Sequence, residues 1–231
     1  MLTRIAELGG RVLRAFFGAL LLVRRPRPIH PRGRVLDGWI TWLPDAAPSG
    51  IAWIDTVPPA PQPVVARLSR SVGLPDGLPD IIGLALRLDI DGRPADLELA
   101  STGLGIPSRF MLLPHRSPAR ARLGTLLPYR GTRGPVLVCA RTLAPATLPA
   151  GGAGLDAALE TPGWRLRLYH ATPTSLWHPF ADVSLRLAHE QDDRELRFDA
   201  GRHPLPGAGE YPWVRALRDP SYRRAQSVRA G

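Results

Sequence analysis

The sequence predicts a mainly β protein with some helix, built on one closed antiparallel barrel. Short segments of alternating or continuous apolar residues recur along the chain, and Gly, Pro or Asp clusters separate them, which is typical of strands joined by tight turns. About nine such segments occur, a number that suits a barrel without free edges. The expected strands are 35–42, 51–55, 64–70, 81–88, 96–101, 136–143, 164–169, 183–189 and 195–198. With 231 residues, 44% of them hydrophobic, the chain can bury one sizeable core.

The N-terminal 25 residues predict a helix with an apolar centre, 15–23, between arginines. This centre is far shorter than the roughly 20 residues that span a bilayer, and no small-residue cleavage site follows it. We therefore expect neither a transmembrane helix nor a secretory signal. An arm packed on its own domain or on a partner subunit is favoured, and a segment lying on a membrane surface is the alternative. The expected organisation is a helical arm, 1–26, and one domain, 27–231.

The run 64–101 predicts an antiparallel meander of three strands, around which the rest of the chain is arranged. In its first strand, Arg67 and Ser69 lie two positions apart and so share one face. Asp91-Gly92 is typical of a two-residue hairpin turn. Gly83, inside the second strand, indicates a backbone that another group approaches closely.

The second half of the chain has weaker signals. A short helix is expected at 118–127, a glycine-rich loop at 151–154, a hairpin tip at 192–193, and two short C-terminal helices at 209–217 and 220–229. The single cysteine, Cys139, cannot form an intrachain disulfide, and its apolar surroundings in the sequence predict a buried small hydrophobe.

Charge and motif content narrow the classes of function. The formal charge is +10, and every basic residue other than histidine is an arginine, which would suit nucleic acid or an anionic surface. The arginines are scattered among apolar and proline-rich segments, however, so we favour a solvated basic surface and expect no nucleic-acid partner. The histidines lack the close spacing of zinc ligands, and no Gly-x-Ser-x-Gly elbow or carboxylate pair supports hydrolase chemistry.

Three spaced motifs resemble the haem catalases and their smaller relatives, the catalase-like peroxidases and allene oxide synthases. The central one is Arg67-x-Ser69, Pro79-Asp80-x-x-Gly83-x-Ala85-x-Arg87 and Asp96-Leu97. Near the N-terminus, Arg27, His30 and Gly33 fit the spacing around the family's distal histidine. Near the C-terminus, Arg218, Ser221, Tyr222 and Arg229 fit its Arg-x-x-Ser-Tyr motif and the arginine that follows. The resemblance implies a barrel of the catalase type.

The resemblance also implies haem b as cofactor and assigns the residues around it. Tyr222 would be the axial ligand of the haem iron, with Arg218 beside it. Proton transfer would belong to His30, whose ring Ser69 would fix. The other expected haem-binding residues are Arg27, Arg67, Gly83, Phe110 and Arg229, although for Phe110 core packing is slightly favoured over a place at the haem edge.

One departure from the family pattern bears on activity. Ala100 stands where the family has an asparagine over the haem, with Ser101 and Thr102 as the nearest polar residues. The expected function is a haem-dependent peroxidase that acts on organic hydroperoxides or hydrogen peroxide with a small-molecule reductant. A hydroperoxide-rearranging enzyme like the allene oxide synthases, and a non-catalytic haem-binding or basic interaction module, are the alternatives. We expect a cytoplasmic protein, with membrane contact through 1–25 and homo-oligomerisation left open.

Overall fold

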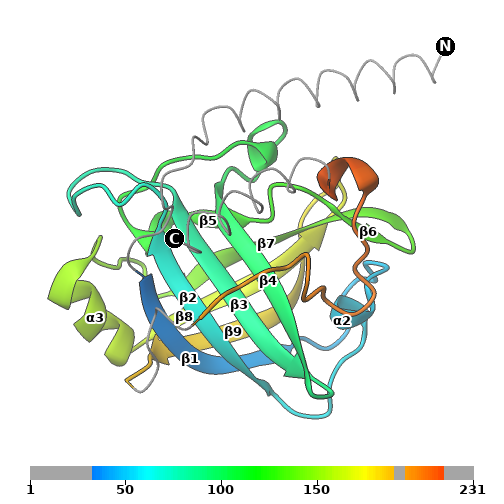
Figure 1. Ribbon diagram of the computed structural model, residues 1–231, viewed down its shortest axis with the longest axis horizontal. Helices are drawn as coiled ribbons and strands as arrows, with labels where there is room; N and C mark the ends of the chain where they lie inside the picture. The colour runs from blue at the N-terminus through cyan, green and yellow to red at the C-terminus, as the bar shows by residue number, and fades with distance from the viewer. Residues whose placement is uncertain (1–32, 190–195, 216–231) are drawn as a thin grey trace, which may run out of the picture. The chain divides into compact units, whose positions relative to one another are not determined.

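The computed structural model describes residues 33–189 and 196–215 (Figure 1). Its helices are α2 (Ala52–Asp55) and α3 (Gly152–Glu160), with 3₁₀ turns η1 (Ser108–Phe110) and η2 (Pro118–Arg120). Its strands are β1 (Gly33–Trp42), β2 (Gln62–Arg70), β3 (Ile82–Ile90), β4 (Arg93–Thr102), β5 (Arg122–Gly124), β6 (Tyr129–Gly131), β7 (Gly134–Ala144), β8 (Trp164–Ala171) and β9 (His178–Leu187). Residues 33–210 belong to one compact unit and 211–215 to another.

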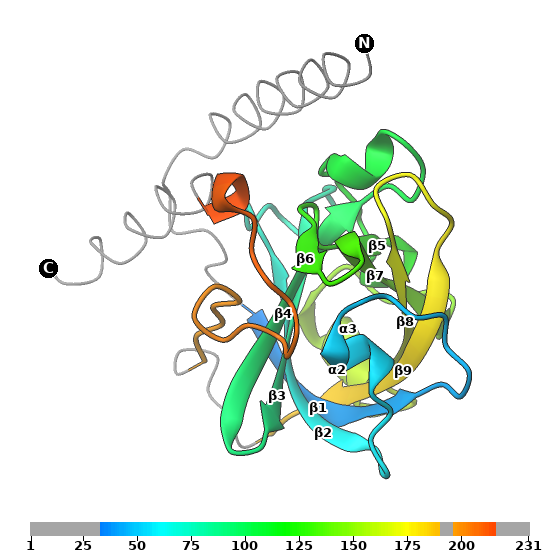
Figure 2. The same cartoon turned by 90° about the vertical axis from the view of Figure 1, so that its right-hand side faces the viewer.

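The strands close into an antiparallel barrel. Each strand from β1 to β5 pairs with the next, except that β5 passes over β6 and pairs with β7. The circle continues through β8 and β9 and is closed by the pairing of β9 with β1, while β6 pairs with β7 alone among the strands (Figures 1 and 2). Closure leaves no long unpaired edge on the barrel, which confirms the predicted fold class.

The barrel interior is an apolar core, as the alternation in the sequence predicts. On β2 the buried residues Val64, Ala66 and Leu68 point inward, and the intervening residues point outward. Trp164 of β8 is fully buried in the same core. Burying a side chain of this kind contributes about 1.5–3 kcal/mol, so the filled interior accounts for much of the stability of the fold.

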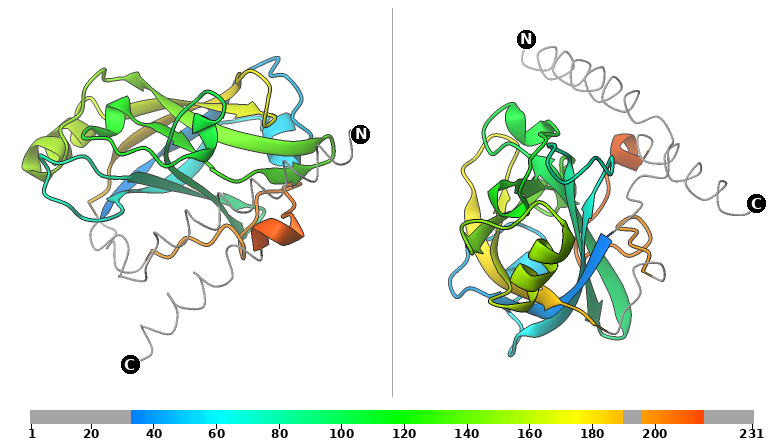
Figure 3. Two further views of the ribbon diagram at one scale, coloured as in Figure 1. Left: turned by 90° about the horizontal axis from the view of Figure 1, so that it is seen from above. Right: turned by 90° about the vertical axis from the view of Figure 1, so that its left-hand side faces the viewer.

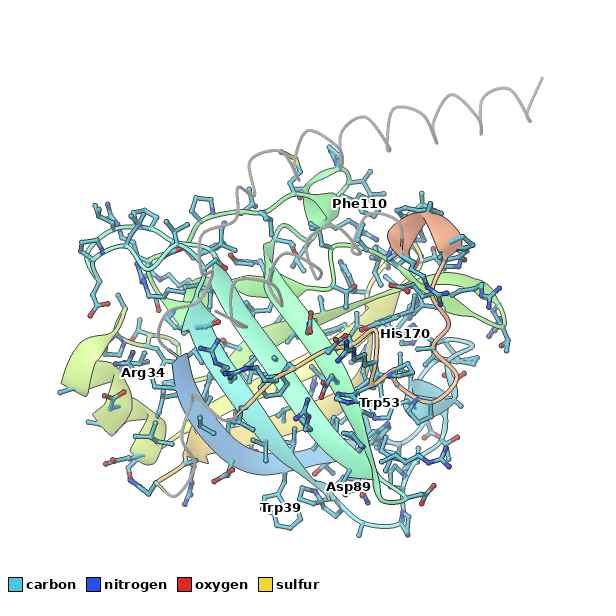
Figure 4. The ribbon with its side chains drawn as sticks, viewed as in Figure 1. Arg34, Trp39, Trp53, Asp89, Phe110 and His170 are labelled. Atoms are coloured by element: carbon cyan, nitrogen blue, oxygen red, sulfur yellow. The ribbon has the colours of Figure 1, made fainter. Side chains whose placement is uncertain are left out.

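One end of the barrel is closed by α2. Trp53 of α2 packs edge-on against Trp42 and Phe180, and the Trp42 indole donates a hydrogen bond to the Trp53 carbonyl. The His170 ring donates from Nε2 to the Ala47 carbonyl over 2.8 Å. Burial lowers the pKa of His170, so its imidazole is neutral near pH 7. Figure 4 shows Trp53 and His170 together at this end of the barrel, away from Arg34.

The central meander forms as predicted. Asp91 and Gly92 both have positive φ, 53° and 74°, as a two-residue hairpin turn with the right twist requires. This turn sets the β3–β4 register, in which Ile90 pairs with Arg93 and Arg87 with Asp96.

Four local predictions are wrong. Residues 51–55 contain helix α2 instead of a strand, because the Asp55 carboxylate accepts hydrogen bonds from the Ser49 and Gly50 amides and turns the chain. The helix expected at 118–127 is only η2, since 122–124 pairs as β5 with two strands. The glycine-rich stretch opens α3, whose Leu155 and Leu159 are buried. In the expected strand at 195–198, the described residues 196–198 have no strand structure.

The expected C-terminal helix at 209–217 is helical at 212–215, while 209–211 are not. The predicted hairpin tip at 192–193 and helix at 220–229 lie outside the described residues. Within 33–189 and 196–215, no helix has the length and hydropathy of a membrane-crossing segment.

Candidate functional site on the outer face of the barrel

A row of small residues crosses the outer face of β1–β4. Gly33 pairs with Ser69, Ser69 with Gly83, and Gly83 with Ala100. Residues that are directly paired lie on the same side of a sheet, so this small-residue row (Gly33, Ser69, Gly83 and Ala100) faces away from the core. None of its side chains is larger than that of serine. The wall is therefore flat enough here for a planar group to approach the backbone.

A second row lies beside the first on the same face. In it Val35 pairs with Arg67, Arg67 with Ala85, and Ala85 with Glu98. Arg67 and Glu98 therefore flank Ala85, whose small side chain leaves a gap between the cation and the carboxylate. The predicted common face of Arg67 and Ser69 is confirmed by this register, and the fold places Gly83 directly opposite Ser69.

The Ser69 hydroxyl makes only a weak hydrogen bond, to the backbone of Gly83. The residue is 7% exposed, and its Oγ lies 3.5 Å from the Gly83 carbonyl oxygen, at the outer limit of a hydrogen bond. Because little free energy is lost when so long a bond breaks, the hydroxyl can turn toward a group placed over the row.

Because residue 100 is alanine, the row has no side-chain amide. The hydroxyls of the next two residues do not take its place. The Ser101 hydroxyl accepts from the Ile82 amide at 3.1 Å and donates to the Leu113 carbonyl at 2.6 Å. The Thr102 hydroxyl donates to the Gly103 carbonyl at 3.2 Å. Both hydroxyls hold the end of β4 in place.

Phe110, the other described residue of the predicted site, lies in η1 beyond the end of β4 (Figure 4). It is 8% exposed and is not a member of either row. Its assignment to the haem edge stays a prediction. Arg27, His30, Arg218, Tyr222 and Arg229 lie outside the described residues.

Asp80, part of the central motif, stabilises the loop between β2 and β3. Its buried carboxylate accepts hydrogen bonds from four backbone amides, at 2.7–3.1 Å, those of Val72, Gly73, Leu74 and Ile81. Arg70 Nε lies 3.8 Å from the same group. Asp80 therefore sets the point at which β3 begins, and with it the position of Gly83.

An ion cluster around the buried carboxylate of Asp96, which was not predicted from the sequence, lies further along the outer face of β3 and β4. Arg87 donates to both carboxylate oxygens of Asp96, at 2.7 and 2.6 Å, and His203 Nδ1 donates to Asp96 Oδ2 at 2.9 Å. The Asp96 side chain is fully buried, which by itself would raise its pKa, but the hydrogen bonds from Arg87, the Asp199 amide and His203 hold that pKa below the usual value.

The same cluster holds the segment 196–203, which we call the strap, against the barrel. The Asp199 amide donates to Asp96 Oδ2 at 2.7 Å, the Ala200 amide to Glu98 at 3.3 Å, and Arg87 donates to the Arg197 carbonyl. The strap crosses the outer face of β3 and β4, next to the two rows (Figure 1). The hairpin register of Asp91-Gly92 could have predicted the Arg87–Asp96 pair, but no local signal pointed to His203.

Among the described residues, no group of three or more His, Cys, Asp or Glu side chains could hold a metal ion. The two rows themselves contribute one cation, Arg67, one carboxylate, Glu98, and one hydroxyl, Ser69, around a flat surface. Such a surface can bind a planar anionic ligand and orient a polar group over it.

Comparison with known proteins identifies the architecture. The chain is similar to a fungal catalase, with 14% identity and a TM-score of 0.56 over 87% of this chain and 59% of that chain. It is also similar to catalase A from Saccharomyces cerevisiae, with 13% identity and a TM-score of 0.63 over 90% of this chain and 63% of that one. No family model matches the sequence, and no curated protein matches it. The chain thus has a catalase-like fold and spans about three fifths of the catalases' length.

Proposed function

We propose that this chain is a haem-dependent oxidoreductase of the catalase type, acting as a peroxidase on organic hydroperoxides or hydrogen peroxide. The observation that carries the proposal is the small-residue row beside Arg67, because the residues of the central motif meet there on one face of a catalase-like barrel. The motif gives the residue types, and the strand register makes them neighbours.

The described residues fit one side of a haem. A planar macrocycle needs a flat wall, which Gly33, Gly83 and Ala100 provide, and its carboxylates need cations such as Arg67. Arg27 and Arg229 are the other cations that the motifs assign to these carboxylates. When bound, haem b would supply the redox chemistry that cleaves the peroxide bond.

The protein's own part is to ligate, orient and move protons. Tyr222 would ligate the iron as a phenolate, since both the metal and guanidinium groups favour loss of a proton whose ordinary pKa is near 10. His30 would accept a proton from the hydroperoxide and return it to the leaving oxygen. The Ser69 hydroxyl would hold the other ring nitrogen of His30 and so fix the orientation of the imidazole.

Ala100 favours a substrate bulkier than hydrogen peroxide. It pairs with Gly83 on one side and Gly124 on the other, so side chains are small along this part of the wall. We therefore propose an organic hydroperoxide and a small-molecule reductant as reaction partners. Hydroperoxide rearrangement, as in the allene oxide synthases, would use the same space, and haem binding without turnover is the non-enzymatic alternative. A cytoplasmic protein with membrane contact through 1–25 and self-association completes the proposal.

The substitution Ala100→Asn tests the assignment of this position. Oxygen release from hydrogen peroxide requires a second peroxide to be oriented, and one positioned donor is worth roughly 10²–10³ in rate. We expect the wild-type chain to release little oxygen but to oxidise reductants with an organic hydroperoxide, and Ala100→Asn to raise oxygen release roughly 100-fold. An oxygen electrode and a chromogenic reductant measure the two activities.

Two controls accompany this experiment. Ser184→Asn adds an amide on the outer face of β9 and should change neither activity, whereas His30→Ala should suppress both. Wild-type oxygen release as fast as that of a full catalase, or no gain in Ala100→Asn, would refute the role given to residue 100.

A further inference from the structure

Charge is strongly segregated along the sequence. Residues 99–155 contain seven arginines and no aspartate or glutamate; the arginines are at 109, 116, 120, 122, 130, 133 and 141. Residues 161–181 also lack acids and contain Arg165 and Arg167. Four of these arginines, Arg122, Arg141, Arg165 and Arg167, lie on the adjacent strands β5, β7 and β8, which form one wall of the barrel.

Three arginines lie in one cross-strand row on the outer face of this wall. Arg122 of β5 pairs directly with Arg141 of β7, which pairs with Arg167 of β8. Like charges in direct opposition are unfavourable in a sheet. Arg167 is neutralised by Asp182 of β9, with contacts of 2.6 and 2.9 Å. No such relief is present for Arg122 and Arg141, which are exposed and have no carboxylate partner among the described residues.

Two exposed apolar side chains lie on loops at the edge of the same wall. Ile106, after β4, is 57% exposed, and Leu176, between β8 and β9, is 82% exposed, the largest value among the described large hydrophobic residues. We call this pair the apolar tip. The two loops lie side by side in Figure 2. Both side chains are thus largely exposed to solvent.

The loops of the apolar tip are held together by hydrogen bonds. The Trp177 indole donates to the Leu104 carbonyl at 2.9 Å, and Arg109 donates to the Thr172 and Ser175 carbonyls at 3.0 and 3.1 Å. The Arg109 guanidinium also lies 4.9 Å from the ring centre of Trp177. The exposure of Ile106 and Leu176 is therefore built into the fold.

The loops of the apolar tip begin near the arginine row. Thr102, which precedes the loop of Ile106, pairs with Arg122, and Ala171, which precedes the loop of Leu176, pairs with Leu137 on the same strand as Arg141. Cys139 and Arg141 are two positions apart on β7 and face the same side, away from the core. Burial raises the pKa of the Cys139 thiol to about 12. The thiol is therefore protonated near neutral pH and adds no charge beneath this surface.

We propose that this wall docks on an anionic lipid surface. Arg122 and Arg141 would bind phosphate-bearing headgroups, whose charge relieves their mutual repulsion, while Ile106 and Leu176 would enter the acyl boundary. Nucleic acid would satisfy the arginines but would leave the apolar tip without a role, so the combination favours lipid. The residues of this surface are not those of the small-residue row.

Vesicle sedimentation with the full chain tests the proposal. We use vesicles of phosphatidylcholine alone, and of phosphatidylcholine with about 30% phosphatidylglycerol, at about 0.1 M salt. Arg122→Ser/Arg141→Ser should weaken binding to the anionic vesicles about 30-fold, and Ile106→Ser/Leu176→Ser about tenfold. The controls are Arg93→Ser/Arg202→Ser, two exposed arginines elsewhere, and Val57→Ser/Val72→Ser, two exposed apolar residues elsewhere. Both controls should bind like the wild type.

Four results would overturn the proposal. The first two are equal binding to the two vesicle types, and an equal loss of binding in Arg122→Ser/Arg141→Ser and in its arginine control. The third is no loss of binding in Ile106→Ser/Leu176→Ser. The fourth is preferential binding to duplex DNA that depends on the arginine row but not on the apolar tip. Circular dichroism of each variant confirms that it is folded. Haem binding and peroxidase activity are not part of the readout, so this test stands apart from the proposed function.

Discussion

Leucine in place of Gly83 is expected to weaken haem binding by up to about 100-fold while the barrel stays folded. Gly83 lies between Ser69 and Ala100 in the small-residue row, where the wall has almost no side-chain atoms. A branched side chain would project outward and hold a planar group away from the backbone. The residues of β3 that point into the core, such as Leu84 and Leu86, are untouched, so the packing of the interior is unchanged.

Haem titration followed by absorption measures the effect of Gly83→Leu. Ser184→Leu places the same side chain outward on β9 and should bind haem like the wild type. Circular dichroism shows whether each variant is folded. If folded Gly83→Leu binds haem with wild-type affinity, the small-residue row is not the haem surface.

Alanine in place of Asp96 is expected to lower the free energy of unfolding by about 3–5 kcal/mol, as is typical when a buried ion pair loses one partner. The change would leave Arg87 without its carboxylate and remove the acceptor of His203 and of the Asp199 amide. The strap would lose its main attachment to β4. Urea denaturation at pH 7 gives the free energy, and limited proteolysis within 196–203 reports release of the strap.

The pH dependence of this loss has a definite sign. The folded pKa of Asp96 lies below the usual value, so its contribution is present above about pH 4 and is lost as the pH falls through the folded pKa. The difference between Asp96→Ala and wild type should shrink accordingly in acid. The control is Asp182→Ala, which breaks a half-exposed pair with Arg167 and should cost at most about 1 kcal/mol. Equal losses in the two variants would show that the buried cluster does not secure the strap.

The sequence predicted the barrel because its signals are local. Alternation along 64–70 defines the two faces of β2, and the Asp91-Gly92 turn defines the β3–β4 register. The opposition of Ser69 and Gly83 belongs to the β2–β3 register, which no such two-residue turn defines. The short strand β5 was missed because its three residues are held by two neighbouring strands and have no pattern of their own.

Contacts between distant segments could not be predicted in this way. His203 reaches Asp96 across 107 positions, and Arg122, Arg141 and Arg167 become neighbours only because β5, β7 and β8 are adjacent. A count of acids over 99–155 would have exposed the charge segregation. That Arg122, Arg141 and Arg167 form one row depends on the strand order of the closed barrel, which such a count does not give.

The central claim is that haem binds over the small-residue row and is ligated by Tyr222. The absorption spectrum of the full chain titrated with haem tests this claim most directly. We expect a high-spin ferric spectrum with tyrosinate character, saturating at one haem per chain, and we expect Tyr222→Phe to abolish it or to change the ligand. A chain that stays colourless with haem in excess, or a spectrum that is identical in Tyr222→Phe, would contradict the account.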